Sequence, residues 1–361
     1  MHKFDRLSLV TRNTCEVITE AELRKLLGIG KPLRGYIGVE PSGLFHVGWI
    51  IWASKLKDLM DADVEMTFLE ATWHAFINDK LGGKLENIHK CASYLEHCLM
   101  ALGIDVKRLN VVKAEDLISD PDYWSLLLRI AKRVTLSRVK RAITIMGRRE
   151  KEGLADFSKL IYPAMQVTDI FYLDLDVCLG GSDQRRAHVL AREVASGLGH
   201  RKPIALHTPL LMGLGGLERM DAGMLTEADL IEAKMSKSKS ETCLFIHDSP
   251  VEVRKKVSNA FCPPRQVDNN PIIELNKHIL FSDLGFKLSV ERAGKYGGPI
   301  TLGSFEELAE AYQRGEIHPL DLKKATATAL DKKLSPVRKY FAENPTAGSL
   351  LREVEELTIS R

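Results

Sequence analysis

The stretch Gly35-Tyr36-Ile37-Gly38-Val39-Glu40-Pro41-Ser42-Gly43 decides the fold, because a short apolar strand runs directly into a glycine-bearing turn. From residue 46 to residue 60 the apolar spacing becomes helical, and residues 64–69 have the pattern of a second strand. Strand, turn, helix and strand in this order form a βαβ unit, which implies a parallel sheet with helices on both faces. The sequence therefore predicts an α/β fold with a doubly wound, Rossmann-like parallel sheet.

The remaining chain is expected to surround this sheet with helices. Residues 4–29 are polar and helical in pattern, helical patterns dominate residues 85–102 and 123–149, and the chain beyond residue 249 is largely helical. The segment 214–233 is unusual, and a flap and a surface excursion are both compatible with it. We expect an N-terminal helical arm (1–34), a Rossmann-like domain (35–248, with a helical insertion at about 85–151) and a small helical C-terminal domain (249–361).

Composition excludes several classes of protein. The 361 residues are 45% hydrophobic and 27% charged with a net charge of +3, so the whole chain is no general polyanion binder and any nucleic-acid contact must be local. No apolar run approaches the ~20 residues that cross a membrane, and residues 1–20 lack the apolar run of a signal peptide. The six cysteines form no CxxC pair, which argues against a zinc ribbon or a disulfide framework. A reduced cytoplasmic location is the default expectation.

Two distant segments indicate a nucleotide site. His46-Val47-Gly48-Trp49 offers an imidazole and a glycine where a backbone can approach a ligand closely. Lys234-Met235-Ser236-Lys237-Ser238 offers ammonium and hydroxyl groups that suit a polyphosphate. In isolation each segment is compatible with a packed histidine or a solvated charged surface.

Six ordered segments resemble the class I aminoacyl-tRNA synthetases, and specifically the tyrosyl-tRNA synthetases of the archaeal and eukaryotic type. The resemblance runs from Tyr36 to about Lys339 and rests on several motifs rather than one. The segments are residues 36–43, 46–49, 162–169 (Tyr-Pro-Ala-Met-Gln-Val-Thr-Asp), 180–186 (Gly-Gly-Ser-Asp-Gln-Arg-Arg), 234–238 and 318–322 (His-Pro-Leu-Asp-Leu).

The resemblance implies a two-step reaction without a protein nucleophile. A tyrosine carboxylate attacks the α-phosphate of ATP and expels pyrophosphate, and the terminal ribose hydroxyl of tRNA then attacks the acyl-adenylate; the protein works by positioning and charge stabilisation. The implied catalytic residues are His46, Lys234, Ser236 and Lys237. The implied ATP-binding residues are Gly38, Ser42, His46, Gly48, Asp183 and Lys237. Trp49 departs from the family, which usually has a second histidine there that is thought to meet the ribose.

The resemblance also implies a tyrosine pocket. Tyr36 and Asp169 match the positions that hold the substrate phenol hydroxyl, and such a site rejects phenylalanine because buried polar groups would lose their partner; these synthetases are themselves a standard example of that discrimination. Tyr162 and Gln166 lie one helical turn apart and would hold the substrate ammonium. The implied tyrosine-binding residues are Tyr36, His74, Tyr162, Gln166, Asp169 and Gln184.

The tRNA contacts implied by the resemblance fall into two groups. The helical stretch 129–151 is densely basic, and acceptor-stem phosphates are a natural partner for it. Asp321 matches a residue that accepts hydrogen bonds from the first anticodon base, a guanine, on which an aromatic ring can stack. The expected tRNA-binding residues are Arg138, Arg141, Arg185, Arg186, Tyr296 and Asp321.

The resulting expectation is a tyrosine–tRNA ligase that uses ATP with Mg²⁺, binds tRNA(Tyr) and forms a homodimer through the insertion. No carboxylate cluster has the pattern of a dedicated metal site. Two alternatives stay open: a tryptophan–tRNA ligase of the same fold, and a catalytically inactive RNA-binding relative, which Trp49 and the segment 214–233 favour. A dinucleotide oxidoreductase is excluded because the GxGxxG turn is missing.

Overall fold

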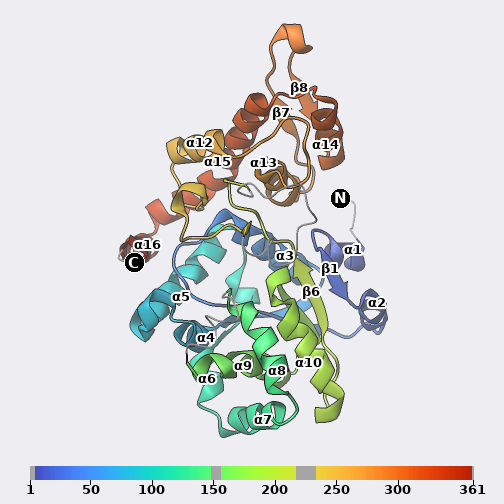
Figure 1. Cartoon of the computed structure of the whole chain (residues 1–361), viewed down its shortest axis with the longest axis vertical. Helices are drawn as coiled ribbons and strands as arrows, with labels where there is room; N and C mark the ends of the chain where they lie inside the picture. The colour runs from blue at the N-terminus through green and yellow to red at the C-terminus, as the bar shows by residue number, and fades with distance from the viewer. Residues whose placement is uncertain (1–4, 148–155, 217–232, 360–361) are drawn as a thin grey trace. The chain divides into compact units, whose positions relative to one another are not determined.

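The computed structural model describes residues 5–147, 156–216 and 233–359 (Figure 1). Contacts between residues divide the chain into two units. Unit 1 contains residues 1–43, 52–209 and 349–361, and unit 2 contains residues 44–51 and 210–348. The domain boundary expected near residue 249 lies inside unit 2, and the short segment 44–51 belongs to unit 2 although its flanking residues belong to unit 1.

Unit 1 is built on a six-stranded sheet, and the predicted Rossmann-like architecture is confirmed. Its strand order is β1-β6-β5-β2-β3-β4, and every neighbouring pair is parallel except β1 with β6. Most residues of β2 and β3 are buried, as expected for central strands covered on both faces. The strands are β1 (Glu16–Ile18), β2 (Leu33–Val39), β3 (Val64–Glu70), β4 (Asn110–Lys113), β5 (Val177–Gly181) and β6 (Ile204–Thr208).

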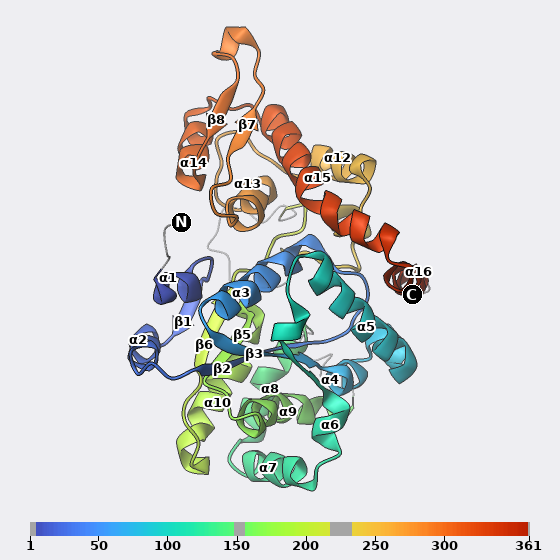
Figure 2. The ribbon, with the colours of Figure 1, turned by 180° about the vertical axis from the view of Figure 1, so that it is seen from behind.

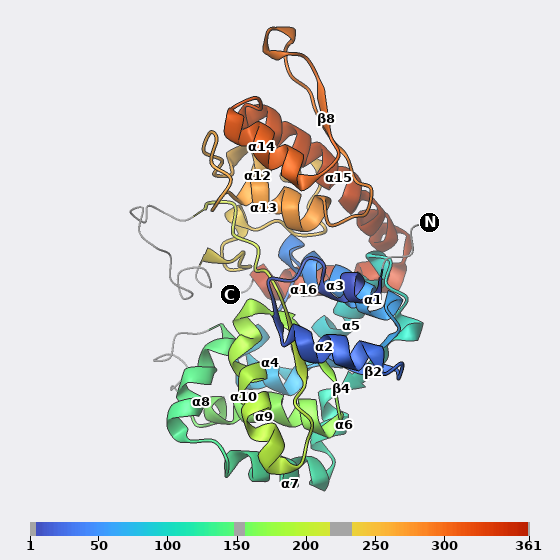
Figure 3. The same cartoon turned by 90° about the vertical axis from the view of Figure 1, so that its right-hand side faces the viewer.

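Helices cover both sides of this sheet. In Figures 2 and 3 the helices α1 and α3 lie on one side, and α8, α9 and α10 lie on the other. The apolar side chains of α7, α9 and α10 share one buried cluster with Tyr36 of β2. The helices of this unit are α1 (Arg6–Thr11), α2 (Glu20–Gly28), α3 (Ile50–Asp61), α4 (Thr72–Ile77), α5 (Leu85–Ala101), α6 (Ala114–Ile118), α7 (Pro121–Ala131), α8 (Leu136–Ala142), α9 (Ser158–Tyr172) and α10 (Arg185–Leu198).

One expectation about local structure is wrong, and two expected helical regions are confirmed with interruptions. The N-terminal stretch is not one helical arm, because β1 separates α1 from α2 and pairs with β6. The helical pattern of residues 123–149 is interrupted where Thr135 caps α8 with its side chain, and the pattern beyond residue 147 lies outside the described residues up to 155. The C-terminal region is largely helical, as expected, and adds one short antiparallel pair, β7 (Leu288–Val290) with β8 (Ile300–Leu302).

The other long elements described in unit 2 are helices. Its helices are α12 (Pro250–Asn259), α13 (Pro271–Leu275), α14 (Phe305–Arg314) and α15 (Pro319–Glu343), and α16 (Pro345–Ile359) begins in it. Ser249 and Glu252 form a capping box at the start of α12. The segment 44–51 is tied to this unit by backbone bonds, from Val47 N to Leu244 O at 2.7 Å and from Ile246 N to Phe45 O at 3.1 Å.

Candidate active site

One face of α9 carries three of the predicted pocket residues. Tyr162, Gln166 and Asp169 are spaced four and three residues apart, so their side chains leave the helix in one direction. Tyr36 from β2 and His74 from α4 lie against this face: the His74 and Tyr162 rings are 4.9 Å apart, and Asp169 is among the charges that act on Tyr36. The structure therefore brings five of the six predicted pocket residues together within unit 1.

Asp169 is a buried carboxylate with a specific partner. Its side chain is 2% exposed, and the Tyr123 hydroxyl donates to Oδ1 over 2.7 Å. Burial raises the pKa of Asp169 to about 7, although the bond from Tyr123 opposes this rise. His74 Nε2 lies 3.4 Å from Oδ2, and burial lowers the pKa of this imidazole to about 4, so it is neutral near pH 7. Tyr123 was not predicted as a site residue.

Several buried polar atoms in this part of unit 1 make no hydrogen bond within the protein. They are both ring nitrogens of His74, Trp73 Nε1 and Gln166 Oε1. Native proteins pair nearly all such groups, so a cluster of them marks a place where a polar ligand completes the bonding. Burial also raises the pKa of Tyr36 well above its ordinary value, which keeps this phenol protonated and able to donate.

A second carboxylate, Glu40, stands at the other end of the pocket. The Tyr162 hydroxyl donates to Glu40 Oε1 over 2.6 Å, Asn78 Nδ2 donates to both carboxylate oxygens over 3.0 and 3.1 Å, and Lys80 Nζ lies 3.6 Å from Oε2. Glu40 was quoted within the fold-deciding turn but was not predicted as a site residue. A carboxylate in a turn that directly follows a buried strand is the signal that could have identified it.

Gln184 completes the predicted pocket set. Gln166 Nε2 donates to Gln184 Oε1 over 3.2 Å, and Gln184 Nε2 donates to the Ile145 carbonyl over 3.1 Å. Asp183 precedes Gln184 in a single turn of 3₁₀ helix between β5 and α10. The two amides and the Glu40 carboxylate therefore give this end of the pocket several hydrogen-bond acceptors for a cationic group.

Two predicted ATP-binding residues lie along the fold-deciding stretch of unit 1. Gly38 is in β2, and a side chain built there would make only ordinary contacts, the closest being 3.4 Å to the Tyr36 ring. Ser42 follows in the turn, before Gly43, whose backbone N–H donates to Cys91 Sγ over 3.2 Å. The space at Gly38 is therefore not taken up by the protein itself.

The remaining predicted phosphate-binding residues lie in unit 2. His46 is buried, its Nδ1 makes no hydrogen bond, and burial together with Lys237 and Lys234 lowers its pKa well below the ordinary value. A neutral imidazole can donate one hydrogen bond without adding charge. The hydroxyl oxygens of Ser236 and Ser238 are 2.9 Å apart. The backbone of Lys234 forms an isolated antiparallel β-bridge with Met212.

Trp49 and Gly48 have partners that the sequence did not reveal. Lys237 Nζ lies 3.8 Å from the centroid of a Trp49 ring, a cation–π geometry, and the Trp49 and His46 rings are 5.1 Å apart. A side chain at Gly48 would come within 3.0 Å of the His46 Nδ1 atom and 3.3 Å of Leu211. Gly48 therefore makes room for the histidine of its own segment.

The predicted tRNA-binding residues other than Tyr296 are exposed or partly exposed. Arg185 Nε donates to Glu16, and Arg186 Nη1 donates to the Arg141 carbonyl over 2.9 Å. Arg138 forms an ion pair with Glu193. In unit 2, Asp321 lies in the first turn of α15. Tyr296 ends the turn Gly294–Tyr296, and its side chain lies outside the described part of the structure, as do residues 148–151 and 217–232 of two predicted segments.

Neither a metal-ligating cluster nor a membrane-spanning helix is found among the described residues. In that part of the chain, no group of three or more His, Cys, Asp and Glu side chains is placed to hold a metal ion. None of the described helices is long and apolar enough to cross a membrane.

Comparison with known proteins gives a consistent result. A family model described as "tRNA synthetases class I (W and Y)" matches residues 30–335. A Sulfolobus acidocaldarius protein named tyrosine–tRNA ligase is 53% identical over 353 residues, covering 98% of each chain. The crystal structure of tyrosyl-tRNA synthetase from Aeropyrum pernix matches with a TM-score of 0.87 at 45% identity, covering 97% of this chain and 98% of that one. A tyrosyl-tRNA synthetase from Pyrococcus horikoshii complexed with L-tyrosine matches with a TM-score of 0.87 at 41% identity, covering 96% and 98%.

Proposed function

Because the chain belongs to the archaeal-type tyrosine–tRNA ligases of class I, we propose how its residues divide the work of that reaction. The ligase activates tyrosine with ATP to tyrosyl-adenylate and transfers tyrosine to the terminal adenosine of tRNA. The alternative of a tryptophan–tRNA ligase is set aside, since relatives at about half identity over nearly the full chain are tyrosine enzymes. These same relatives are named as ligases, so the inactive relative is set aside as well.

The observation that carries the proposal is the Asp169 carboxylate held by Tyr123 between Tyr36 and His74. Oδ1 accepts from Tyr123, which leaves Oδ2 to accept from the hydroxyl of a substrate phenol. The protonated Tyr36 hydroxyl can donate to the oxygen of that substrate phenol. Phenylalanine in this pocket would leave the buried carboxylate without its partner, which costs more than the lost bond itself. We assign the phenol end of the substrate to this group of residues.

The opposite end of tyrosine is an ammonium group, and we assign it to Tyr162, Gln166 and Gln184 with Glu40 behind them. Glu40 receives a hydrogen bond from Tyr162, so that hydroxyl oxygen is left as an acceptor for the ammonium. The Glu40 charge also favours a cation nearby. This arrangement supports a role for Glu40 as the residue that orients Tyr162.

The phosphates of ATP are assigned to His46, Lys234, Ser236 and Lys237, with Gly38 and Ser42 beside the nucleotide and Asp183 on its ribose. In the first step the tyrosine carboxylate oxygen forms a bond to the α-phosphorus as the bond to pyrophosphate breaks. Donors that meet the charge growing on pyrophosphate lower the barrier because they bind the transition state best. We expect Mg²⁺ to enter on the phosphates of ATP, as is usual for this ion.

The tRNA is assigned to Arg138, Arg141, Arg185 and Arg186 at its acceptor end, and to Asp321 with Tyr296 at its anticodon. These arginines are exposed or only partly buried in unit 1, where phosphates can reach them. We place the enzyme in the cytoplasm, where its tRNA is used.

A homodimer is proposed through the helical insertion. Trp124 and Leu128 on α7 and Leu136 on α8 are 42%, 64% and 57% exposed, an unusual set of large apolar side chains to leave in water. Light scattering after size-exclusion chromatography tests this: Leu128→Glu should shift the dimer toward monomer, and an unchanged mass would contradict this interface.

The pocket is tested by ATP–pyrophosphate exchange with tyrosine, phenylalanine and tryptophan. Exchange with tyrosine is expected in the wild type, and Asp169→Ala should lose it while nucleotide binding, measured by calorimetry, stays close to normal. Equal loss of both in a folded variant would show that Asp169 supports the structure rather than the pocket.

A further inference from the structure

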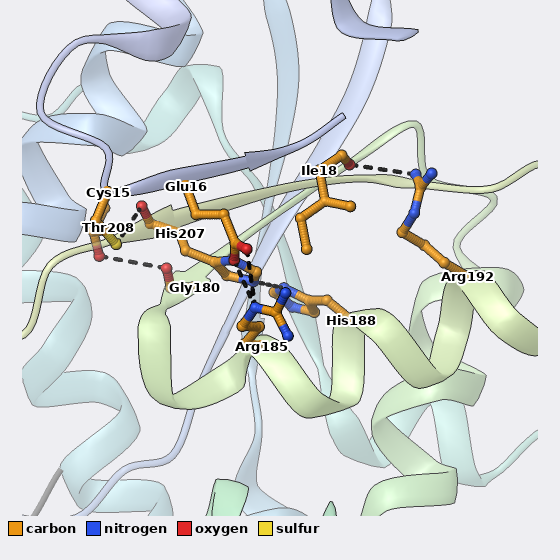
Figure 4. A network of polar contacts seen from close by, with 9 residues as sticks. All are labelled: Cys15, Glu16, Ile18, Gly180, Arg185, His188, Arg192, His207 and Thr208. Atoms are coloured by element: carbon orange, nitrogen blue, oxygen red, sulfur yellow. Dashed lines mark hydrogen bonds and ion pairs between the residues drawn. The ribbon is translucent and has the colours of Figure 1, made fainter. Parts of the chain in front are cut away.

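A polar row crosses three strands of unit 1, outside the residues assigned above. The strand register pairs Glu16 of β1 with His207 of β6, and His207 with Gly180 of β5. Side chains at paired positions point to the same face of a sheet. Gly180 contributes no side chain, and His188 from α10 reaches the row there (Figure 4).

The side chains of this row form a continuous hydrogen-bond chain. Glu16 Oε2 lies 2.7 Å from His207 Nδ1, and His207 Nε2 lies 3.0 Å from His188 Nδ1. The two imidazole planes differ by only 8°, and both rings are buried. Burial lowers the pKa of His188 to about 3 and also lowers the pKa of His207, so both rings are neutral near pH 7.

The chemistry of these groups determines which atom donates and which accepts in each hydrogen bond. A carboxylate only accepts, so the proton of neutral His207 is on Nδ1. Its Nε2 is then an acceptor, and His188 must donate from Nδ1. Glu16 therefore determines the tautomer of a histidine that it does not touch.

The two ends of this hydrogen-bond chain lie next to residues that we assign to different substrates. At the outer end Arg185 Nε donates to the Glu16 oxygens over 2.9 and 3.0 Å, with the arginine side chain 46% exposed (Figure 4). At the inner end, a side chain at Gly180 would meet His188 Cε1 at 3.1 Å and Gln184 Cβ at 3.0 Å. His188 and Gln184 thus share the space over the end of β5.

We propose that Glu16, His207 and His188 are positioning residues that hold the start of α10, so that Arg185 is set for the tRNA acceptor end and Gln184 for the tyrosine ammonium. The inference rests on the proposed function, in that Arg185 contacts tRNA. None of the three touches the reacting atoms. We expect Glu16 to affect mainly the position of Arg185, and hence tRNA binding. We expect His188 to affect mainly Gln184, and hence tyrosine binding, and His207 to affect both.

The outer end is tested with Glu16→Ala against the control Glu22→Ala. Glu22 also joins the N-terminal region to α10, through Arg192 at 2.7 Å, two helical turns beyond Arg185. For Glu16→Ala the KM for tRNA in charging should rise roughly twofold to fivefold, as expected for a partly exposed ion pair, with a smaller effect on exchange. Glu16→Gln keeps an acceptor oxygen and should raise the KM for tRNA less than Glu16→Ala does. Glu22→Ala should leave the KM for tRNA in charging and the KM for tyrosine in exchange unchanged.

Non-additivity separates this proposal from the tRNA assignment. If Glu16 acts through Arg185, the double variant Glu16→Ala/Arg185→Ala should resemble Arg185→Ala alone. An unchanged tRNA KM in Arg185→Ala would overturn the tRNA assignment itself. An effect of Arg185→Ala without one of Glu16→Ala, or an equal effect of Glu22→Ala, would overturn the positioning role while leaving the tRNA assignment in place.

The inner end is tested by measuring the KM for tyrosine in exchange, where tRNA is absent, and the KM for tRNA separately in charging. His188→Asn keeps a donor for His207 but removes the ring over Gly180, and should raise the KM for tyrosine more than the KM for tRNA. His207→Gln should raise both. Unchanged tyrosine KM values in both folded variants, checked by thermal melting, would show that the buried chain only supports the fold.

Discussion

Replacing Tyr123 by Phe tests the pocket without touching a predicted substrate contact. The substitution removes one oxygen, whose hydrogen bond to Asp169 Oδ1 is 2.7 Å long, and keeps the buried ring. Because this bond stabilises the charged carboxylate, its loss must raise the pKa of Asp169 further above about 7. The variant should therefore hold Asp169 in its protonated form over a wider pH range.

The size of this rise follows from the strength of the bond. A hydrogen bond to a charged group contributes about 1.5–3 kcal/mol, and one pKa unit corresponds to about 1.4 kcal/mol. The pKa of Asp169 should thus rise by roughly one to two units. Since an ionised carboxylate accepts from a phenol more strongly than a neutral acid does, tyrosine binding should weaken wherever the variant is protonated and the wild type is not.

The assay is the pH profile of kcat/KM for tyrosine in ATP–pyrophosphate exchange between pH 6 and 9.5. This ratio reports ionisations of the free enzyme. In the wild type, kcat/KM for tyrosine should rise with pH through a pKa near 7. In Tyr123→Phe the same rise should occur one to two pH units higher. At pH 7.5 the variant should lose roughly tenfold, and it should recover most of this loss at pH 9.5.

The matched control is Tyr172→Phe. Tyr172 lies at the end of α9, and its hydroxyl donates to a different aspartate, Asp120. Its ring packs 5.5 Å from the Tyr123 ring, so Tyr172→Phe also removes one hydroxyl beside the pocket, but not the bond to Asp169. Its pH profile should therefore coincide with that of the wild type. If Tyr123→Phe lowers kcat/KM equally at every pH, the hydroxyl does not act through the ionisation of Asp169, and the reasoning is refuted.

Three further results are expected. Since burial raises the pKa of Asp169 from 3.8 to about 7, the ionised carboxylate destabilises the folded protein increasingly as the pH rises from about 4 to about 7. Asp169→Asn should therefore resist urea better than the wild type at pH 8 but not at pH 4, and the reverse order would contradict the burial argument. Trp49→Ala removes the cation–π contact with Lys237, worth about 0.5–2 kcal/mol, so kcat for exchange should fall roughly twofold to thirtyfold, while Trp49→Phe retains most of it; a change confined to the tyrosine KM would speak against this role. Asp321→Ala should impair charging and spare exchange, and equal losses in the two assays would make Asp321 structural.

Features that depend on local pattern were predictable from the sequence. The strands β2 and β3 are continuous apolar runs bounded by turn residues, which is how buried parallel strands are recognised. The four-residue spacing of Tyr162 and Gln166 was enough to indicate that both lie on one helical face. These predictions succeeded because the signal lies within about ten residues of the chain.

Features that depend on a distant partner were not predictable. β1 has only three residues, too few to show alternation, and is a strand because β6 lies beside it. Tyr123 belongs to another helix than Asp169 and is 46 positions away, so no spacing rule connects them. The partner of Trp49 was equally hidden, because Lys237 is contributed by a loop late in the chain.

The bridge between His46 and Phe245 has a consequence for how the protein is made. The segment 44–51 leaves the ribosome early, yet its backbone bonds are to residues 244–246, which are synthesised about 200 positions later. At 5–20 residues per second, the residues that bond this segment are synthesised on the order of 10–40 seconds after His46, to which we assign the ATP phosphates. During that interval the residues on either side can already fold with unit 1. A nascent chain halted before residue 244 should therefore bind tyrosine before it can organise the ATP phosphates.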